Sequence, residues 1–282
     1  MTAITAVPLF RWRPSTFDPT LAIVVPIVVA LVAMAVIGPF VAPYPPSQTN
    51  VLDANAAWSG AHWLGTDALG RDILSRALYG ARLSLLGPAL VVVLAALLAA
   101  ACALAAAWHG GWVDKLVTRV FDFLFAFPGL LLAVLAVSVF GVGLTAPIIA
   151  ITLTYVPYIG RVVRAVALRD RHSPYIQACS LAGIPAWRII IRHLLPGLLP
   201  MIRAQATVSF GAALTDLAAV SFIGLEVQPP TAEWGVMVAE GQASLLNGHP
   251  AQSLAAGGLI VLTVVVFNIL GERLTRREEL KR

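Results

Sequence analysis

Long stretches without charged side chains dominate the hydrophobic pattern of this chain. An α-helix rises about 1.5 Å per residue, so about 20 apolar residues are needed to cross roughly 30 Å of hydrocarbon. Six stretches are candidates: Leu21–Val41, Leu83–Trp108, Phe123–Phe140 and Ala251–Gly271, then the shorter Leu144–Gly160 with Pro147 and Pro157, and Ala204–Leu225, which Asp216 interrupts. The pattern therefore predicts an all-α membrane protein with six transmembrane helices.

Composition supports this interpretation. Of the 282 residues, 59% are hydrophobic and only 12% are charged, and the mean hydropathy is +0.85. Soluble proteins keep about a quarter of their residues charged, so a water-soluble domain is excluded. The first apolar stretch is longer than a signal-peptide core and is not followed by a small-residue cleavage site, so we interpret it as an uncleaved anchor.

The distribution of Lys and Arg predicts the orientation. Basic residues that flank transmembrane helices are retained in the cytoplasm. With the N-terminus inside, sixteen of the nineteen basic residues become cytoplasmic, and only Arg71, Arg76 and Arg82 lie outside. The net charge of +5 therefore indicates topology, and no basic stretch carries the interleaved aromatic residues that suit nucleic acid. Both termini are expected in the cytoplasm.

This orientation divides the chain into five parts. They are a cytoplasmic N-terminal segment (1–20), a first transmembrane helix (21–41), an extracytoplasmic segment (42–82), a five-helix transmembrane core (83–272) with a cytoplasmic loop (161–203), and a cytoplasmic tail (273–282).

The extracytoplasmic segment contains a predicted amphipathic helix. Asp72 and Arg76 are four residues apart, and Ile73, Ala77 and Ala81 share one helical face. We expect a helix on the outer surface, either solvated or in contact with a binding protein.

The cytoplasmic loop has helix signals of its own. Ser173 is a suitable N-cap with Pro174 in the first turn, Gly183 is a suitable end, and Pro185 can open a second helix that runs to Pro196. Ala178, Leu181 and Ala182 give the first helix a small apolar face that suits a groove on a partner. The alternative is a loop that only joins two transmembrane helices.

Three motifs resemble one family. Gln177-Ala178-Cys179, three residues, Gly183, and then His193 to Pro196 resemble the cytoplasmic EAA loop of permease subunits of ATP-binding cassette (ABC) importers. Two further motifs resemble the dipeptide/oligopeptide/nickel permease family, in its second-permease, C-type subunit. The first comprises His62–Asp67, Leu69–Asp72, Ser75-Arg76 and Gly80–Leu85, and the second comprises Ser221–Leu225, Val227–Pro230 and Glu233-Trp234-Gly235.

The resemblance implies a type I ABC importer permease fold with a cytoplasmic coupling-helix loop, in a multi-pass protein of the bacterial cytoplasmic (inner) membrane. It also implies three kinds of partner: a second homologous permease, two cytoplasmic ATPases that hold ATP and Mg, and an extracytoplasmic substrate-binding protein. The implied ATPase-coupling residues are Gln177, Ala178, Cys179, Leu181, Ala182, Gly183, His193 and Pro196. This sequence departs from the family pattern at Gln177, where Glu is usual, and at Cys179, where Ala is usual. Peptides are the favoured substrates, and nickel, metal chelates and glutathione stay open.

Motifs for chemistry in the chain itself are missing. A phosphate-binding P-loop needs Gly-Lys-Ser/Thr, but Lys115 follows Asp114 and Lys281 follows Leu280. The five histidines lack metal-ligand spacing, the two cysteines, Cys102 and Cys179, are not expected to form a disulfide, and no catalytic constellation stands out. We therefore expect no enzyme activity and no catalytic, cofactor or metal site in this chain.

Asp216 is the one acidic residue well inside a predicted transmembrane helix. Such a residue is costly unless it faces protein or water. It is a candidate for the translocation path or a proton relay, and the alternative is a structural bond to a neighbouring helix. A proton- or ion-coupled secondary transporter is the rival function, although the two halves show no internal repeat. An ion-channel subunit and a membrane enzyme are more distant alternatives.

Overall fold

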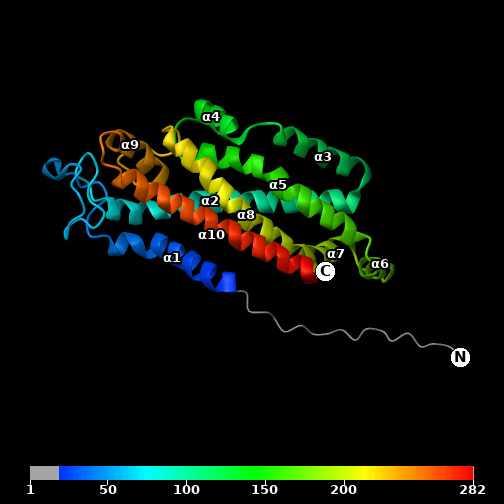
Figure 1. Ribbon diagram of the computed structural model, residues 1–282. Coiled ribbons are helices and arrows are strands. Elements are labelled where there is room, and N and C mark those ends of the chain that lie inside the picture. Colours follow the sequence, from blue (N-terminus) through cyan, green and yellow to red (C-terminus); the bar gives the residue numbers. More distant parts are fainter. Residues whose placement is uncertain (1–18, 282) are drawn as a thin grey trace.

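The computed structural model describes residues 19–281, and the regular elements in that part of the chain are helices. The axes of the long helices are roughly aligned, and the helices form one elongated bundle (Figure 1). Most of the expected N-terminal segment, 1–20, and Arg282 lie outside the described residues.

Four helices in this part of the chain are long and apolar enough to cross a membrane. They are α1 (Pro19–Val41), α2 (Ile73–His109), α5 (Thr145–Arg171) and α10 (Ala251–Lys281). A fifth span is possible if the bent pair α3–α4 is counted as one. The predicted all-α membrane protein is confirmed, whereas the count of six transmembrane helices stays a prediction.

The predicted third span, Phe123–Phe140, is wrong as a single straight helix. The chain forms α3 (Gly111–Phe125) and α4 (Gly129–Phe140), and the two axes differ by 84°. Pro128 lies at the break, where it has no N–H to donate and disfavours the helical conformation for the residue before it. The local sequence chemistry therefore ends α3 and starts α4 in a new direction.

α8 (Leu195–Phe222) is also long enough to span, at about 42 Å for its 28 residues. It is not among the helices that are apolar enough to cross a membrane in the described part of the chain. Asp216 and several small polar residues dilute its apolar character. It packs against α2, α5 and α10, which places it in the middle of the bundle.

The α2–α5 pair is the most extensive helix contact in the bundle. Small residues recur at every fourth position of α2, and Ala95, Ala99 and Ala103 are completely buried. Small side chains let helix backbones approach closely, which is the common way in which membrane helices pack. On α5, a Cβ at Gly160 would lie only 2.5 Å from the Phe121 ring, so this ring requires glycine beneath it.

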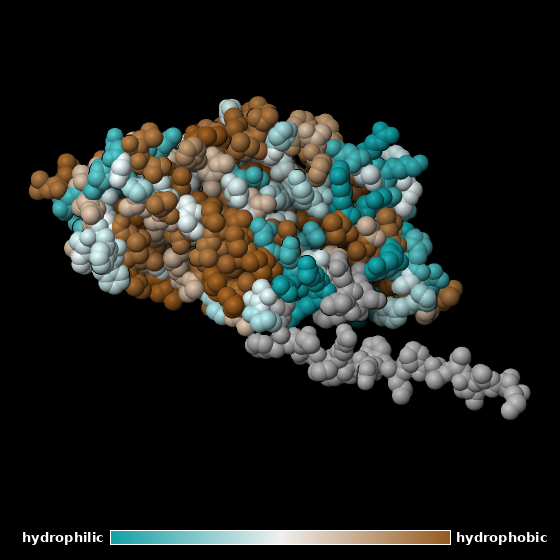
Figure 2. All heavy atoms as spheres, viewed as in Figure 1, coloured by the Kyte–Doolittle hydropathy of each residue, from teal (hydrophilic) through white to brown (hydrophobic). Residues whose placement is uncertain are grey.

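The two ends of the bundle differ. α9 (Trp234–Leu246), the short helix η1 (Val51–Asp53) and the loops around them lie at one end, which we call the α9 end (Figure 1). α6 (Pro174–Leu181) and α7 (Ala186–Ile189) lie at the other, the α6 end. On the face shown in Figure 2, hydrophobic surface covers the middle of the molecule, and hydrophilic residues gather most strongly toward the α6 end. This distribution fits a bundle that crosses a bilayer along its long direction.

The predicted amphipathic surface helix is wrong. Ile73, Ala77 and Ala81 form the first turns of α2 and are buried, and the Arg76 side chain is 0% exposed. Asp72 caps this helix, because its carboxylate accepts the Ser75 N–H at 2.7 Å. The helix that contains the predicted second span therefore starts at Ile73, ten residues before Leu83, and its first turns lie inside the α9 end.

Candidate functional site

The helix α6 lies beyond the ends of the long helices (Figure 1). The Ser173 hydroxyl accepts the N–H of Ile176 at 3.4 Å, and Pro174 occupies the first turn. After the helix, Gly183 has a φ of +76°, a conformation that glycine adopts without strain. The cap and the turn predicted from Ser173 and Gly183 are present.

One face of α6 is buried in a small core. Ile176 and Cys179 pack with Ile189 of α7, and Trp108 at the end of α2 packs against them. Cys179 is only 9% exposed, so its side chain belongs to this core and not to the outer face of the helix. The core attaches α6 to α2 and to the chain that enters α8.

The opposite face of α6 is exposed. It consists of Gln177, Ala178, Leu181 and Ala182, and the Leu181 side chain is 89% exposed. Nearby in sequence, Trp187 is 59% exposed. The α6 end thus combines apolar side chains with the hydrophilic surface of Figure 2, a composition typical of protein–protein interfaces.

Gln177 has a local role at the start of this face. Its side-chain amide donates a hydrogen bond to the backbone carbonyl of His172 at 3.0 Å. His172 is the C-cap of α5, so the bond satisfies a carbonyl that the helix itself leaves unpaired. A glutamate carboxylate has no proton to donate in this way when it is ionised.

His193, in the segment that leads into α8, contacts Tyr175 at the start of α6. The Tyr175 hydroxyl lies 2.6 Å from His193 Nδ1, and the two rings meet edge to face with centroids 5.5 Å apart. The pair connects α6 to the segment that precedes α8. Of the predicted coupling residues, His193 therefore supports the loop through a contact at its surface.

The predicted second loop helix does not end at Pro196. Pro185 is the N-cap of α7, which continues through a π-helical turn, η2 (Ile190–Leu194), directly into α8. Pro196 lies in the first turn of α8. A proline has no N–H and collides with the carbonyl four residues earlier, and a widened π turn relieves both problems. The loop and α8 are consequently one continuous helical path.

Arginines fix the ends of the long helices around α6. Arg164 forms a two-pronged ion pair with Asp114, with both nitrogen–oxygen distances at 2.6 Å. The Arg171 guanidinium donates to the Ala107 carbonyl and lies 5.5 Å from the centre of the Trp108 ring. These contacts hold α5 against α2 and α3, so α6 extends from a braced platform.

Asp216 lies at a cavity inside the bundle. The Tyr155 hydroxyl of α5 donates to Asp216 Oδ2 of α8 at 2.9 Å. The cavity has a volume of about 330 Å³ and lies at the break between α3 and α4. Asp216 therefore has a neighbouring helix as a partner and also borders open space, so the structural and the path interpretations both apply.

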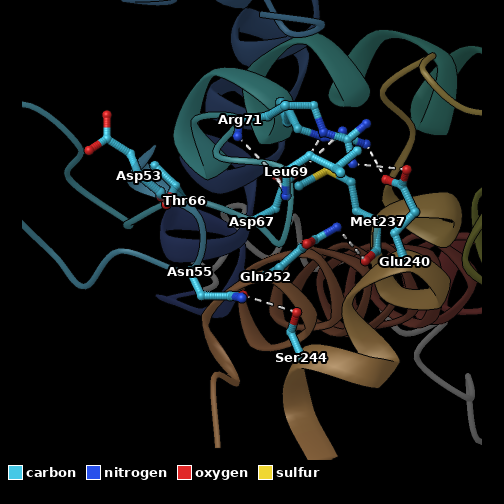
Figure 3. Close-up of polar contacts among 11 residues, drawn as sticks. Asp53, Asn55, Thr66, Asp67, Leu69, Arg71, Met237, Glu240, Ser244 and Gln252 are labelled. Carbon is cyan, nitrogen blue, oxygen red and sulfur yellow. Dashed lines mark hydrogen bonds and ion pairs between the residues drawn. The ribbon is translucent and has the colours of Figure 1, made fainter. Parts of the chain in front are cut away.

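A buried ionic cluster organises the α9 end (Figure 3). Asp67 accepts from Arg71 Nε at 2.5 Å and from Arg76 Nη1 at 3.3 Å. Glu240 of α9 accepts from Arg71 Nη2 at 2.9 Å and also from Arg76. Two guanidinium groups and two carboxylates thus join the segment before α2, α2 itself and α9 into one unit.

The other two family motifs meet at the same end. The Trp234 side chain is completely buried, and its indole N–H donates to the Ala77 carbonyl at 3.0 Å. Ser84 of α2 donates to Glu233 at 2.7 Å and accepts the Trp234 N–H at 2.9 Å. The motif that runs into α2 and the motif between α8 and α9 are therefore two halves of one packed contact.

The comparisons with known proteins agree with these motifs. Residues 93–279 match the family described as binding-protein-dependent transport system inner membrane component. The chain belongs to this family. Residues 24–57 also match the N-terminal TM domain of oligopeptide transport permease C. The resemblance inferred from the three motifs is confirmed.

Individual relatives from this family are similar in sequence. The chain is 37% identical over 199 residues to the dipeptide transport system permease protein DppC of Alkalihalophilus pseudofirmus. It is 39% identical over 199 residues to the glutathione transport system permease protein GsiD of Escherichia coli O157:H7 and of Shigella boydii. Each alignment covers 71% of this chain and 65% of the relative, so the chain matches these relatives over 65% of their length.

Two residues of this family member escaped the sequence analysis. Glu240 completes the ionic cluster and Tyr155 binds Asp216, yet each lies more than sixty positions from its partner in the sequence. No local pattern indicates such pairs. Within the described residues, no group of three or more His, Cys, Asp or Glu side chains is close enough together to hold a metal ion.

Proposed function

We propose that this chain is a transmembrane permease subunit of an ATP-driven importer, with the α6 end in the cytoplasm. The supporting observation is a braced, exposed apolar helix at one end of a membrane-length bundle, in a chain of the binding-protein-dependent transport family. Both termini then lie in the cytoplasm, and the α9 end faces the outside. The seven arginines between Arg161 and Arg203 support this orientation.

In this proposal α6 is the coupling helix. Its exposed face of Gln177, Ala178, Leu181 and Ala182 enters a groove on a cytoplasmic ATPase, and Gly183, His193 and Pro196 maintain the shape of the loop. Cys179 does not contact the ATPase; it supports α6 by packing in the core that it shares with Ile189 and Trp108. Movement of the ATPase is passed to the membrane because α7, η2 and α8 form one helical path.

The proposed partners follow from the same arrangement. They are a second homologous permease, two ATPases that bind ATP and Mg, an extracytoplasmic substrate-binding protein and the lipid bilayer, with no role for nucleic acid. ATP hydrolysis takes place in the ATPases, and this chain is not an enzyme. The work of this chain is to stabilise two conformations differently as nucleotide binds to its partner.

We propose peptides or peptide-like solutes as the cargo. Two relatives are called dipeptide and glutathione transport proteins, and glutathione is itself a tripeptide. Nickel and related small solutes are the second candidate class. An ion-coupled secondary transporter is the rival function, and an experiment on energy supply separates it from an importer.

The experiment is reconstitution of the chain in liposomes with and without the candidate partners. We expect uptake of labelled peptide only with the ATPases, the second permease, the loaded binding protein and internal ATP. Loaded binding protein should also raise ATP hydrolysis. Uphill uptake by this chain alone, driven by a proton gradient without ATPase, contradicts the proposal.

A further inference from the structure

The break between α3 and α4 opens a cavity whose walls have one distinctive chemistry. It is lined by a carboxylate, two tyrosines and two phenylalanines, which are Asp216, Tyr155, Tyr158, Phe125 and Phe127. The remaining lining residues are Leu124, Ala126, Pro128, Gly129 and Thr154, so no basic side chain lines the cavity. A carboxylate surrounded by aromatic faces is the arrangement that proteins use to bind ammonium groups.

A hydrogen bond and two ring–ring contacts fix the positions of the aromatic rings and the Asp216 carboxyl group. The Tyr155 hydroxyl donates to Asp216 at 2.9 Å, and the ring centroids of Tyr155 and Tyr158 are 5.7 Å apart. The Phe125 ring lies 4.8 Å from that of Tyr158. Because its own hydroxyl is bonded to the acid, Tyr155 fixes the position of the carboxylate at the cavity wall.

One cation lies near this cavity but is already paired. The Arg161 guanidinium lies 4.3 Å above the Phe125 ring and forms a 2.8 Å ion pair with Asp122. It does not line the cavity, and no positive side chain there neutralises Asp216. The Asp216 carboxyl group therefore has no cationic partner in the cavity lining and is open to a ligand.

The cavity also reaches the surface of the chain. Tyr158 is 55% exposed and Phe127 is 42% exposed, so a solute can enter between them. Tyr155 lies ten residues from the start of α5, about 15 Å along the helix, which places the cavity within the membrane-crossing part of the bundle. At about 330 Å³ it is at the lower end of the range of small-ligand pockets and fits one end of a peptide.

We infer that this cavity is a transient binding site for a primary ammonium group on the solute that the permease carries. The inference rests on the proposed function only for the source of that group. In a peptide the source is the free N-terminus or a lysine side chain. Non-helical backbone at membrane depth is tolerated where it lines a polar cavity, which accounts for the break at this position.

The first test measures binding without transport. The full chain carries Ala126→Cys at the exposed cavity wall, Cys102 and Cys179 are replaced by alanine, and alkylation of the new thiol is timed in nanodiscs. We expect n-butylammonium to slow alkylation about tenfold or more, as for a contact worth a tenfold change in affinity, and n-butanol to have no effect. Asp216→Asn should remove the protection, whereas Glu272→Gln, an acid-to-amide change at an exposed position of α10 outside the cavity lining, should retain it. Equal protection by the amine and the alcohol, or none by either, overturns the inference.

The second test identifies the source of the ammonium group in the reconstituted importer. Three peptides of equal length are compared: free N-terminus without lysine, N-acetylated with lysine, and N-acetylated without lysine. The binding protein is the same throughout, so the ratio of variant to parent uptake for each peptide isolates the permease. We expect Asp216→Asn to reduce uptake of the amine-bearing peptides about tenfold relative to the doubly blocked one, and Asp216→Glu to restore part of it. An equal reduction for all three peptides assigns Asp216 a structural role and overturns the inference. Protection in the first test without any ATP-dependent uptake in the second leaves the site standing and rejects the proposed function.

Discussion

The amide of Gln177 donates a hydrogen bond to the backbone carbonyl of His172, and the nitrogen–oxygen distance is 3.0 Å. The bond joins the exposed face of α6 to the C-terminal cap of α5. The EAA pattern that this loop resembles has glutamate at this position, and an ionised glutamate cannot donate such a bond. Gln177 therefore gives this loop a local contact that the usual acid lacks.

The first prediction compares Gln177→Glu with Gln177→Arg. An exposed hydrogen bond contributes about 1 kcal/mol or less, and the buried Ile176 and Cys179 hold α6 without it. Gln177→Glu should therefore keep ATPase stimulation within about fivefold of the parent. Arginine can still donate to the His172 carbonyl but adds bulk and charge to the outer face, so Gln177→Arg should lose most of the stimulation. Stimulation at the parent level in the arginine variant would show that Gln177 lies outside the ATPase contact.

The second prediction concerns the turn at Gly183. A Cβ there meets no atom within 4 Å, so the cost of a substitution comes from the φ of +76° alone. We expect Gly183→Val to cost about 1–2 kcal/mol in the loop conformation and to weaken co-purification of the ATPases, while membrane insertion is unchanged. Gly197 is the matched control, because a Cβ there also meets nothing within 4 Å but its φ is ordinary. Equal losses in Gly183→Val and Gly197→Val contradict the role of the left-handed turn.

Local chemistry explains what the sequence could predict. The α6 cap at Ser173 and the turn at Gly183 depend on neighbours within a few residues, and both are present in the structure. The apolar stretches likewise predict membrane helices. A segment that crosses the bilayer needs about 20 mostly apolar side chains and must satisfy its backbone hydrogen bonds internally. The family motifs can be recognised without a structure, because the signal is the order of the motifs along the chain.

Long-range partners explain what the sequence could not predict. Arg76 was paired with Asp72 at helical spacing, but its partners are Asp67 and Glu240. Asp72 instead caps α2 and contacts His62 at 2.9 Å. Two charged residues four positions apart are compatible with either an exposed or a covered helix face. Here α9 covers the face of α2 that carries Arg76. Pro128 is a local signal for a break, but proline also occurs inside continuous membrane helices, so the sequence does not predict the 84° change of direction.

The third prediction tests the exposed face of α6. Leu181 is 89% exposed, and burying a leucine in a partner groove contributes about 1.5–3 kcal/mol. Leu181→Ser should therefore lower ATPase affinity at least about tenfold without changing the melting temperature of the isolated chain. Leu246 is the matched control, because it is 83% exposed on α9 at the opposite end.

The two leucine variants also test the orientation. Leu246→Ser should leave ATPase binding unchanged, since in the proposed topology that end faces the outside. If Leu246→Ser weakens ATPase binding and Leu181→Ser does not, the orientation is reversed.

The fourth prediction concerns the ionic cluster of the α9 end. Glu240→Ala leaves Arg71 and Arg76 with the single carboxylate of Asp67, and both arginines are buried. Removing one partner from a buried charge cluster costs about 3–5 kcal/mol. The apparent melting temperature in detergent should fall by several degrees at least. Glu272→Ala on the exposed side of α10 is the control and should have little effect. A Glu240 variant that melts with the parent excludes a stabilising role for the cluster.

Glu226 gives the α9 end a pH dependence. Its carboxylate is 4% exposed in the loop after α8 and accepts a hydrogen bond from the Ser221 hydroxyl at 2.7 Å. Burial raises the pKa of Glu226 to about 8, and the charge of Glu233 adds to the increase, although the Ser221 bond opposes it. The folded chain therefore holds a proton on Glu226 that the unfolded chain releases near pH 4.5.

The fifth prediction follows from the sign of that difference. Between about pH 4.5 and pH 8 the folded state binds more protons than the unfolded state, so the free energy of unfolding falls as the pH rises, and the fall ends above pH 8. Glu226→Gln keeps the shape and the Ser221 bond but cannot ionise. The variant should match the parent at about pH 5 and exceed it by a few kcal/mol at about pH 9, seen as a higher apparent melting temperature in detergent. Glu272→Gln, an acid-to-amide change at an exposed position, should follow the parent across the same range. Melting curves of Glu226→Gln and the parent that stay parallel with pH would mean that Glu226 ionises without cost, and that water reaches the loop between α8 and α9.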